Sequence, residues 1–147
     1  MEQTLAIIKP DAVQRNLSGK ILARLEAAGF VILGMKMVHL SKQDVERFYH
    51  VHRERPFFDS LTTYMASGPA IPLLLQRHDA VKTLRELMGA TNPSEAAEGT
   101  LRQVFALDVE KNAVHGSDSP ESAATEIPFF FSHLEFRARV SILHTAH

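Results

Sequence analysis

The segment SGKILARLEAAGFVILGMKMVHL (residues 18–40) indicates the fold class, because its hydrophobic period changes halfway along. The first half repeats apolar residues at helical spacing and ends at Gly29, a residue typical of a helix C-terminus. The second half alternates apolar residues with a period of two, which predicts a strand over residues 30–40. The expected buried face of that strand consists of Val31, Leu33, Met35 and Met37. A helix joined directly to a strand predicts a domain that mixes both.

The rest of the chain continues this pattern. TLAIIKP (4–10) reads as a buried strand stopped by proline, and SKQDVERFYH (41–50) as a helix with a capping arrangement at its start. A helix over DSLTTYMAS (59–67) precedes a third strand over PAIPLLL (69–75), which Pro72 makes irregular. HDAVKTLRELMG (78–89) is expected to be helical, and residues 90–100 form a loop with room for one helical turn.

The last third of the chain is expected to hold a fourth strand and a final helix. In RQVFALDV (102–109), Phe105, Leu107 and Val109 alternate, which predicts the strand. Ser119 and Pro120 then begin a helix that contains Pro128, a residue expected to bend it. The predicted buried side of this helix consists of Ala124, Ile127, Phe130 and Phe131. The order of elements predicts an α+β fold with a split βαβ arrangement, formed by one domain over residues 1–147.

Composition excludes several classes of function. The chain has no cysteine, which rules out disulfides, thiol catalysis and cysteine-based metal sites and suits the cytoplasm. The net charge is −1, so an anionic ligand must be held by a local cluster of cations, and neither nucleic acid nor a membrane is expected as a main partner. The N-terminal segment does not read as a signal peptide, and no apolar stretch approaches the about 20 residues that a membrane span needs.

His115 lies in KNAVHGSDSPES (111–122), where turn and cap residues surround a single imidazole. Such a histidine can be a nucleophile, a general base, a metal ligand or a structural residue. A hydrolase triad of His115 with Ser117 and Asp118 is disfavoured because adjacent residues rarely converge in the required geometry. A zinc site with His50 and His52 lacks a clear third ligand, and no Walker loop is present. The residues alone leave the other roles open.

The chemistry becomes specific through a resemblance. NAVHGSDSPESAATEI (112–127) resembles the active-site signature of nucleoside diphosphate kinases, and TLAIIKPDAV (4–13) resembles the first strand of that family. ERPFF (54–58) is similar to its nucleotide-clamping segment, and LMGATNP with EGTLR to its site-closing loop. The similarity runs in order from Thr4 to about Phe131, and the tail from about residue 135 lies outside it. The family implies a ferredoxin-like sandwich with a four-stranded antiparallel sheet, and transfer of a γ-phosphate between nucleotides through a phosphohistidine.

The resemblance also implies roles for single residues. His115 matches the nucleophile, Glu126 the group that bonds its other ring nitrogen, and Ser117 a residue that fixes Glu126 or the loop. Gly116 is expected to leave room for the phosphate, and Tyr49 to pack beside Lys9. The residues matching the nucleotide site hold the phosphates (Arg85, Arg102, Thr91 and His52), meet the sugar (Lys9 and Asn112) or enclose the base (Phe57, Leu61 and Val109).

The remaining expectations concern cofactors, assembly and departures from the family pattern. The resemblance implies Mg²⁺ carried by the nucleotide, with no dedicated protein ligands, and a homo-oligomer, either tetramer or hexamer. Gln103 and Val104 replace a glycine–aspartate pair next to Arg102, and could shift that arginine. Two rival functions are a non-catalytic nucleotide-binding relative and a nucleic-acid-binding protein, which the balanced charge disfavours.

Overall fold

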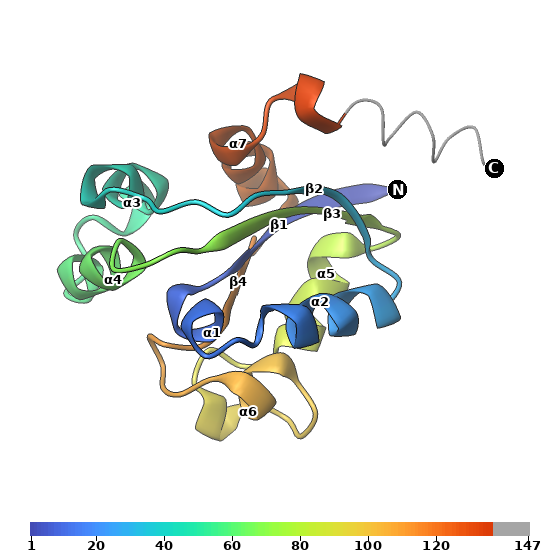
Figure 1. The fold of residues 1–147 in the computed structure, drawn as a ribbon, viewed down its shortest axis with the longest axis horizontal. Coiled ribbons are helices and arrows are strands. Elements are labelled where there is room, and N and C mark those ends of the chain that lie inside the picture. Colours follow the sequence, from blue (N-terminus) through green and yellow to red (C-terminus); the bar gives the residue numbers. More distant parts are fainter. Residues whose placement is uncertain (137–147) are drawn as a thin grey trace.

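A computed structural model describes residues 1–136, so the tail sequence RARVSILHTAH lies outside the described residues. Four antiparallel strands form one sheet in the order β2-β3-β1-β4 (Figure 1). Their bounds are β1 (Glu2–Ile8), β2 (Val31–Met35), β3 (Ile71–Arg77) and β4 (Val114–Gly116). This order is that of a ferredoxin-like sheet, and it confirms the expected α+β fold.

Helices cover both faces of the sheet. The helices are α1 (Pro10–Gln14), α2 (Ser18–Ala27), α3 (Lys42–Phe48), α4 (Phe58–Met65), α5 (Ala80–Met88), α6 (Leu101–Phe105) and α7 (Pro120–Phe130), with 3₁₀ turns η1 (His50–His52) and η2 (Pro93–Glu95). In Figure 1, α2, α5 and α6 lie below the sheet and α7 lies above it, with α3 and α4 at one end. Along β1, Ala6 and Ile8 join the core on the α2 and α5 side, whereas Leu5 and Ile7 join the core on the α7 side.

The local signals that end and begin helices act as the sequence predicts. Ser41 and Asp44 form a reciprocal capping box at the start of α3. Ser119 caps α7 by accepting a hydrogen bond from the Ser122 backbone at 3.0 Å. After α2 and α5, Gly29 and Gly89 adopt φ of 87° and 82°, a region that other residues avoid.

The fourth strand is the main correction. Residues 102–109 do not form a strand: Leu101–Phe105 is the helix α6, and Leu107 and Val109 are exposed. Thr100 caps this helix, and Leu101 and Phe105 pack on one side at a spacing of four. The alternation that predicted a strand was therefore fortuitous. The true strand, β4, has only three residues, too few to show a period.

Two further predictions of burial were wrong. The second strand ends at Met35 rather than at residue 40, and a bulge between Ile32 and Gly34 breaks its alternation. Met35 and Met37 are consequently exposed. In α7, Ala123 is buried and Ala124 is exposed, because the helical face turns by one residue from the face that the pattern suggested.

Pro72 lies within β3, a central strand, without disrupting the sheet. It pairs with Ile7 of β1, and its carbonyl accepts a hydrogen bond from the Lys36 backbone at 3.3 Å. The N–H and C=O of one strand residue point to the same side, so the missing donor of Pro72 faces the β2 side. Regular pairing with β2 ends at Leu73, which explains why this proline is tolerated.

Replacing Pro128 by alanine should stabilise the protein. Pro128 lies inside α7, and its ring is exposed, so no packing is lost. Alanine restores the donor for the Ala124 carbonyl and removes a steric conflict, and we expect a gain of about 1 kcal/mol in unfolding free energy. Urea unfolding of the variant and the wild type measures this gain; an equal or lower midpoint would show that Pro128 contributes to stability.

Candidate active site

His115 lies on β4, opposite Ile7 of β1. Its neighbours Val114 and Gly116 face α5, so the pleat of the strand directs the imidazole to the other face of the sheet. Ala113, directly before β4, has φ of 73°, and the Val114 backbone donates to the Asn112 carbonyl across it at 2.8 Å. This tight turn leads the chain from the loop into β4, and it fixes where the strand that carries His115 begins.

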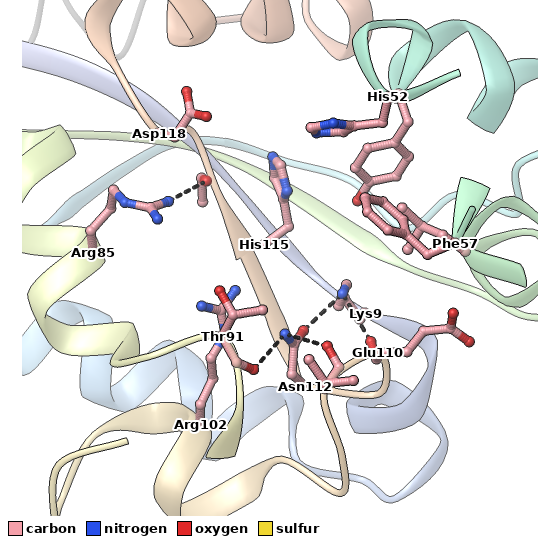
Figure 2. A pocket seen from close by; sticks show the side chains of 14 residues that line it. Lys9, His52, Phe57, Arg85, Thr91, Arg102, Glu110, Asn112, His115 and Asp118 are labelled. Atoms are coloured by element: carbon pink, nitrogen blue, oxygen red, sulfur yellow. Dashed lines mark hydrogen bonds between the residues drawn. The ribbon is translucent and has the colours of Figure 1, made fainter. Parts of the chain in front are cut away.

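A carboxylate holds one nitrogen of the His115 ring. Nε2 is 2.7 Å from Glu126 Oε1, an oxygen that also accepts a hydrogen bond from the Ser117 hydroxyl at 2.9 Å. Because a carboxylate only accepts, Nε2 carries a proton, and in the neutral ring the lone pair is then on Nδ1. Nδ1 has no hydrogen-bond partner among residues 1–136, and the ring projects into the cavity (Figure 2).

Two aromatic rings set the tilt of the imidazole. Phe48 and Tyr49 both meet the His115 ring edge to face, at centroid distances of 5.4 Å and 5.8 Å. Tyr49 is buried, and its burial together with the Glu126 carboxylate raises the pKa of its phenol. Tyr49 therefore stays a neutral wall beside the histidine.

A cavity of about 360 Å³ opens in front of His115, within the range of small-ligand sites. Its lining includes every residue that the resemblance assigned to nucleotide contacts: Lys9, His52, Phe57, Leu61, Arg85, Thr91, Arg102, Val109 and Asn112. Tyr49 and His115 line it too, whereas Ser117 and Glu126 lie behind His115. Residues from six parts of the chain thus converge on one cavity.

Lys9 and Asn112 form a buried polar pair at the floor of the cavity. Lys9 Nζ donates to Asn112 Oδ1 at 2.8 Å and to the Glu110 carbonyl at 3.0 Å, which leaves one of its three donors for a ligand. The Asn112 amide donates to the carbonyls of Thr91 and Val109, both at 3.1 Å. Burial, with the charge of Arg102, lowers the pKa of Lys9 to about 8.

Two arginines supply the other positive charges. Arg102 is buried and donates to the carbonyls of Gly89 at 3.2 Å and Val114 at 2.9 Å, and burial with the Arg85 charge lowers its pKa to about 10. Arg85 is exposed, with one nitrogen 3.4 Å from the Gly116 carbonyl. Within residues 1–136, neither arginine nor Lys9 is in a salt bridge. Unneutralised cations around a cavity suit a polyanion.

The departure at Gln103 and Val104 has not displaced Arg102. Arg102 remains in the cavity wall, tied to two backbone carbonyls. Gln103 turns outward and accepts a hydrogen bond from the Gly99 backbone at 3.1 Å, while Val104 is exposed.

The mouth of the cavity is apolar. Phe57 and Val109 are exposed by 47% and 57%, although both line the cavity, and Leu61 lies half-buried beside them. We call these three residues the apolar slot. His52 stands between the slot and His115, with its ring 5.8 Å from that of Phe57 (Figure 2). Exposed aromatic and branched side chains at a mouth are suited to a flat ligand.

Gly116 has a steric role that the resemblance did not suggest. An added Cβ would lie 2.7 Å from the sulfur of Met88 and 2.9 Å from a methyl of Leu84, both on α5. Gly116 lines the cavity, as expected, but its missing side chain is needed where β4 packs against α5.

Gly116→Ala should therefore destabilise the protein. Displacing Met88 and Leu84 by the added methyl costs about 1–3 kcal/mol of unfolding free energy. Gly19→Ala is the matched control, because nothing lies within 4 Å of the place that its added Cβ would take, and it should be neutral or stabilising. Thermal unfolding of both variants measures the difference; equal midpoints would refute the steric role of Gly116.

Two lining residues were not predicted as ligand contacts. Asp118 accepts a hydrogen bond from the Ser122 hydroxyl at 2.5 Å, which lowers the pKa of its carboxyl. Glu110 accepts from the Ser60 hydroxyl at 3.2 Å. The sequence placed Asp118 in the turn and gave no signal for Glu110, because nothing in the chain indicates that its loop meets α4.

The described residues contain no group of three histidine or acidic side chains placed to bind a metal. Glu110 and Asp118 lie on opposite sides of His115 in Figure 2. None of the helices in the described part of the chain is long and apolar enough to cross a membrane.

A ferredoxin-like sheet that presents a carboxylate-held histidine in a cationic cavity defines a nucleotide-binding phosphotransferase. The chain matches the nucleoside diphosphate kinase family over residues 2–136. It belongs to that family.

Individual relatives agree. Nucleoside diphosphate kinases of Geotalea daltonii and Geobacter sulfurreducens are 60% and 59% identical over 135 residues, which is 92% of this chain and 98% of each relative. The crystal structure of the Aquifex aeolicus nucleoside diphosphate kinase superposes with a TM-score of 0.90 at 47% identity, covering 92% of this chain and 98% of that one. An apo structure of the Encephalitozoon cuniculi enzyme gives 0.86 at 36% identity, covering 89% of both.

Proposed function

We propose that the chain is a nucleoside diphosphate kinase in which Nδ1 of His115 carries the phosphate between two nucleotides. The observation that supports this most directly is the hydrogen bond of 2.7 Å between Nε2 and Glu126, which leaves the Nδ1 lone pair facing the cavity. The lone pair attacks the γ-phosphorus of a nucleoside triphosphate, the bond to the bridging oxygen breaks, and the diphosphate leaves with that electron pair. A second diphosphate then attacks the phosphorus, and the nitrogen–phosphorus bond breaks.

Glu126 and Ser117 keep the reacting ring in one tautomer and orientation. When Nδ1 bonds to phosphorus, positive charge develops on the imidazole, and the Glu126 carboxylate lies 2.7 Å away to stabilise it. Ser117 is buried and donates to the same oxygen at 2.9 Å, so the carboxylate cannot rotate freely. Phe48 and Tyr49 hold the ring from the side. Such prior positioning accounts for most of the catalysis in phosphoryl transfer.

The cavity accommodates a nucleotide with its phosphates at His115 and its base at the mouth. Arg85, Arg102 and Thr91 bind the phosphates together with His52, and Lys9 and Asn112 bind the sugar. The base stacks between Phe57 and Val109 of the apolar slot. Stacking uses no pattern of donors, so it allows purines and pyrimidines alike.

Mg²⁺ would arrive on the nucleotide, held mainly by the phosphates and water, and its charge would neutralise the phosphate oxygens. Asp118 is the carboxylate on the phosphate side of the cavity and would contact the ion's water shell.

Nucleotide affinity should fall as the pH rises through about 8. Lys9 loses its proton there in the free protein, because its pKa is lowered to about 8, and bound phosphates favour the protonated form. Affinity is thus full below pH 8 and declines above it. Calorimetric titration with ADP from pH 6.5 to 9.5 measures the trend. Lys9→Met should bind ADP more weakly and should not show this decline with pH. An unchanged slope in Lys9→Met would assign the titration to another group.

Steady-state kinetics test the two-step transfer. A phosphoenzyme requires that the first diphosphate leave before the second binds, so double-reciprocal plots for ATP at several GDP concentrations should be parallel. Intersecting lines would mean that both nucleotides are bound at once, which would contradict the two-step transfer.

Assembly and location complete the proposal. We expect a homo-oligomer, a tetramer or hexamer, in the cytoplasm. β2 is an edge strand of the sheet with exposed Met35 at its end, a feature that suits association. Light scattering during size exclusion distinguishes the two assemblies from a monomer.

A further inference from the structure

Glu110 lies at the mouth of the cavity, where the proposed function places the base. Its loop is anchored on two sides: the Glu110 carbonyl accepts from Lys9 at 3.0 Å, and its backbone N–H donates to Asp108 at 2.9 Å. The backbone position from which the Glu110 side chain extends is therefore fixed. The carboxylate, by contrast, is free of any salt bridge within residues 1–136.

The carboxylate joins the two walls of the apolar slot. Oε1 accepts a hydrogen bond from the Ser60 hydroxyl at 3.2 Å. Ser60 is three residues after Phe57, so both lie on the same side of the first turn of α4. Glu110 itself follows Val109, the opposite wall. The contact spans the slot from the loop to α4, and it sets an acceptor at the edge of any base held between Phe57 and Val109.

The Glu110 carboxylate lies apart from the cations of the proposed phosphate site. Figure 2 shows the Glu110 carboxylate on the Phe57 side, away from Arg85. At the mouth the Glu110 carboxylate lies where the base is proposed to bind, and its charge also acts on Lys9. Lys9 lies between the two regions and attracts the sugar and phosphates of every nucleotide equally.

We propose that Glu110, held by Ser60, is a specificity-determining residue that favours guanine nucleotides over uracil nucleotides. This inference rests on the proposed function for the placement of the base. An ionised carboxylate is an acceptor with no donor. Guanine presents two adjacent donors, N1–H and the N2 amino group, which match the two carboxylate oxygens. Uracil flanks its single N3–H with two carbonyl oxygens, which the carboxylate repels.

The test compares binding of GDP and UDP by calorimetry in the wild-type protein, Glu110→Gln and Ser60→Ala. The wild type should bind GDP more tightly than UDP, and Glu110→Gln should reduce the ratio of the two dissociation constants by about threefold to tenfold. Ser60→Ala should reduce it less, because the carboxylate remains but is less well held. Glu86→Gln, an exposed residue of α5, is the matched control for loss of one negative charge and should leave the ratio unchanged.

The outcomes separate this inference from the kinase assignment. An unchanged ratio of the GDP and UDP dissociation constants in Glu110→Gln overturns the role of Glu110. If that ratio is unchanged because the affinity for both nucleotides falls equally, Glu110 acts through Lys9 and not on the base. Both results are read from binding alone, without turnover. Failure of the kinase proposal would instead appear as absence of a phosphoenzyme in the wild type, whatever the binding ratio is.

Discussion

Replacing His115 by alanine should abolish phosphate transfer while the protein stays folded. The nucleophile is lost, and His52, the other histidine that lines the cavity, stands beside the apolar slot and not at the position of His115. We expect kcat to fall by about 10⁴-fold or more, on the scale of losses seen when a nucleophile is removed. The measurement is the rate of GTP formation from ATP and GDP.

The folded state should tolerate this change. Glu126 keeps the hydrogen bond from Ser117 at 2.9 Å, so the carboxylate is not left without a partner. Far-ultraviolet circular dichroism and the affinity for ADP should stay close to wild type. His78→Ala is the control, because that side chain is 85% exposed, and it should retain full activity. Near-normal turnover in His115→Ala would refute the mechanism.

Arg102→Ala should damage both stability and activity. Arg102 joins three elements, because it extends from α6 to the carbonyl of Gly89 after α5 and to that of Val114 in β4. Its removal leaves two carbonyls without their donors, at a cost of about 2–4 kcal/mol in unfolding free energy. It also removes a cation from the phosphate site, which should lower kcat/KM by about 100- to 1,000-fold.

Two variants separate these effects. Arg102→Lys keeps the charge but cannot bridge both carbonyls with one planar fork, so it should recover less than half of the stability loss. Arg47→Ala, at an exposed salt bridge of α3, should change stability by less than about 1 kcal/mol. Wild-type values of both unfolding midpoint and kcat/KM in Arg102→Ala would show that Arg102 is neither a structural tie nor a phosphate contact.

The longer elements of the fold could be predicted because burial imposes a recognisable pattern of apolar residues on them. Helix α2 carries a clear period, strand β1 is a continuous apolar run buried on both faces, and the Ser41 and Ser119 caps fix where α3 and α7 begin. β4 escaped prediction because a three-residue edge strand is defined by its pairing with β1, a contact between residues more than 100 positions apart. Local pattern contains no information on such a contact.

The candidate site divides in the same way. The motif resemblance located His115, Glu126 and the residues of the cavity, whereas spacing alone did not show that Glu126 meets the ring from eleven residues away. The contact arises because α7 packs back against β1, the neighbour of β4, after the turn at Ser119. Glu110 could not be found from sequence, since its significance depends on Ser60, fifty residues earlier on α4.

The central claim is that one phosphate passes through His115, and a split reaction tests it most directly. The protein is mixed with Mg²⁺ and γ-labelled ATP, free nucleotide is removed, and unlabelled GDP is then added. The account predicts label on the protein that is acid-labile and base-stable, absent from His115→Ala, and recovered as GTP after the chase. A wild-type protein that binds nucleotide but retains no label, or whose label does not pass to GDP, would contradict the account.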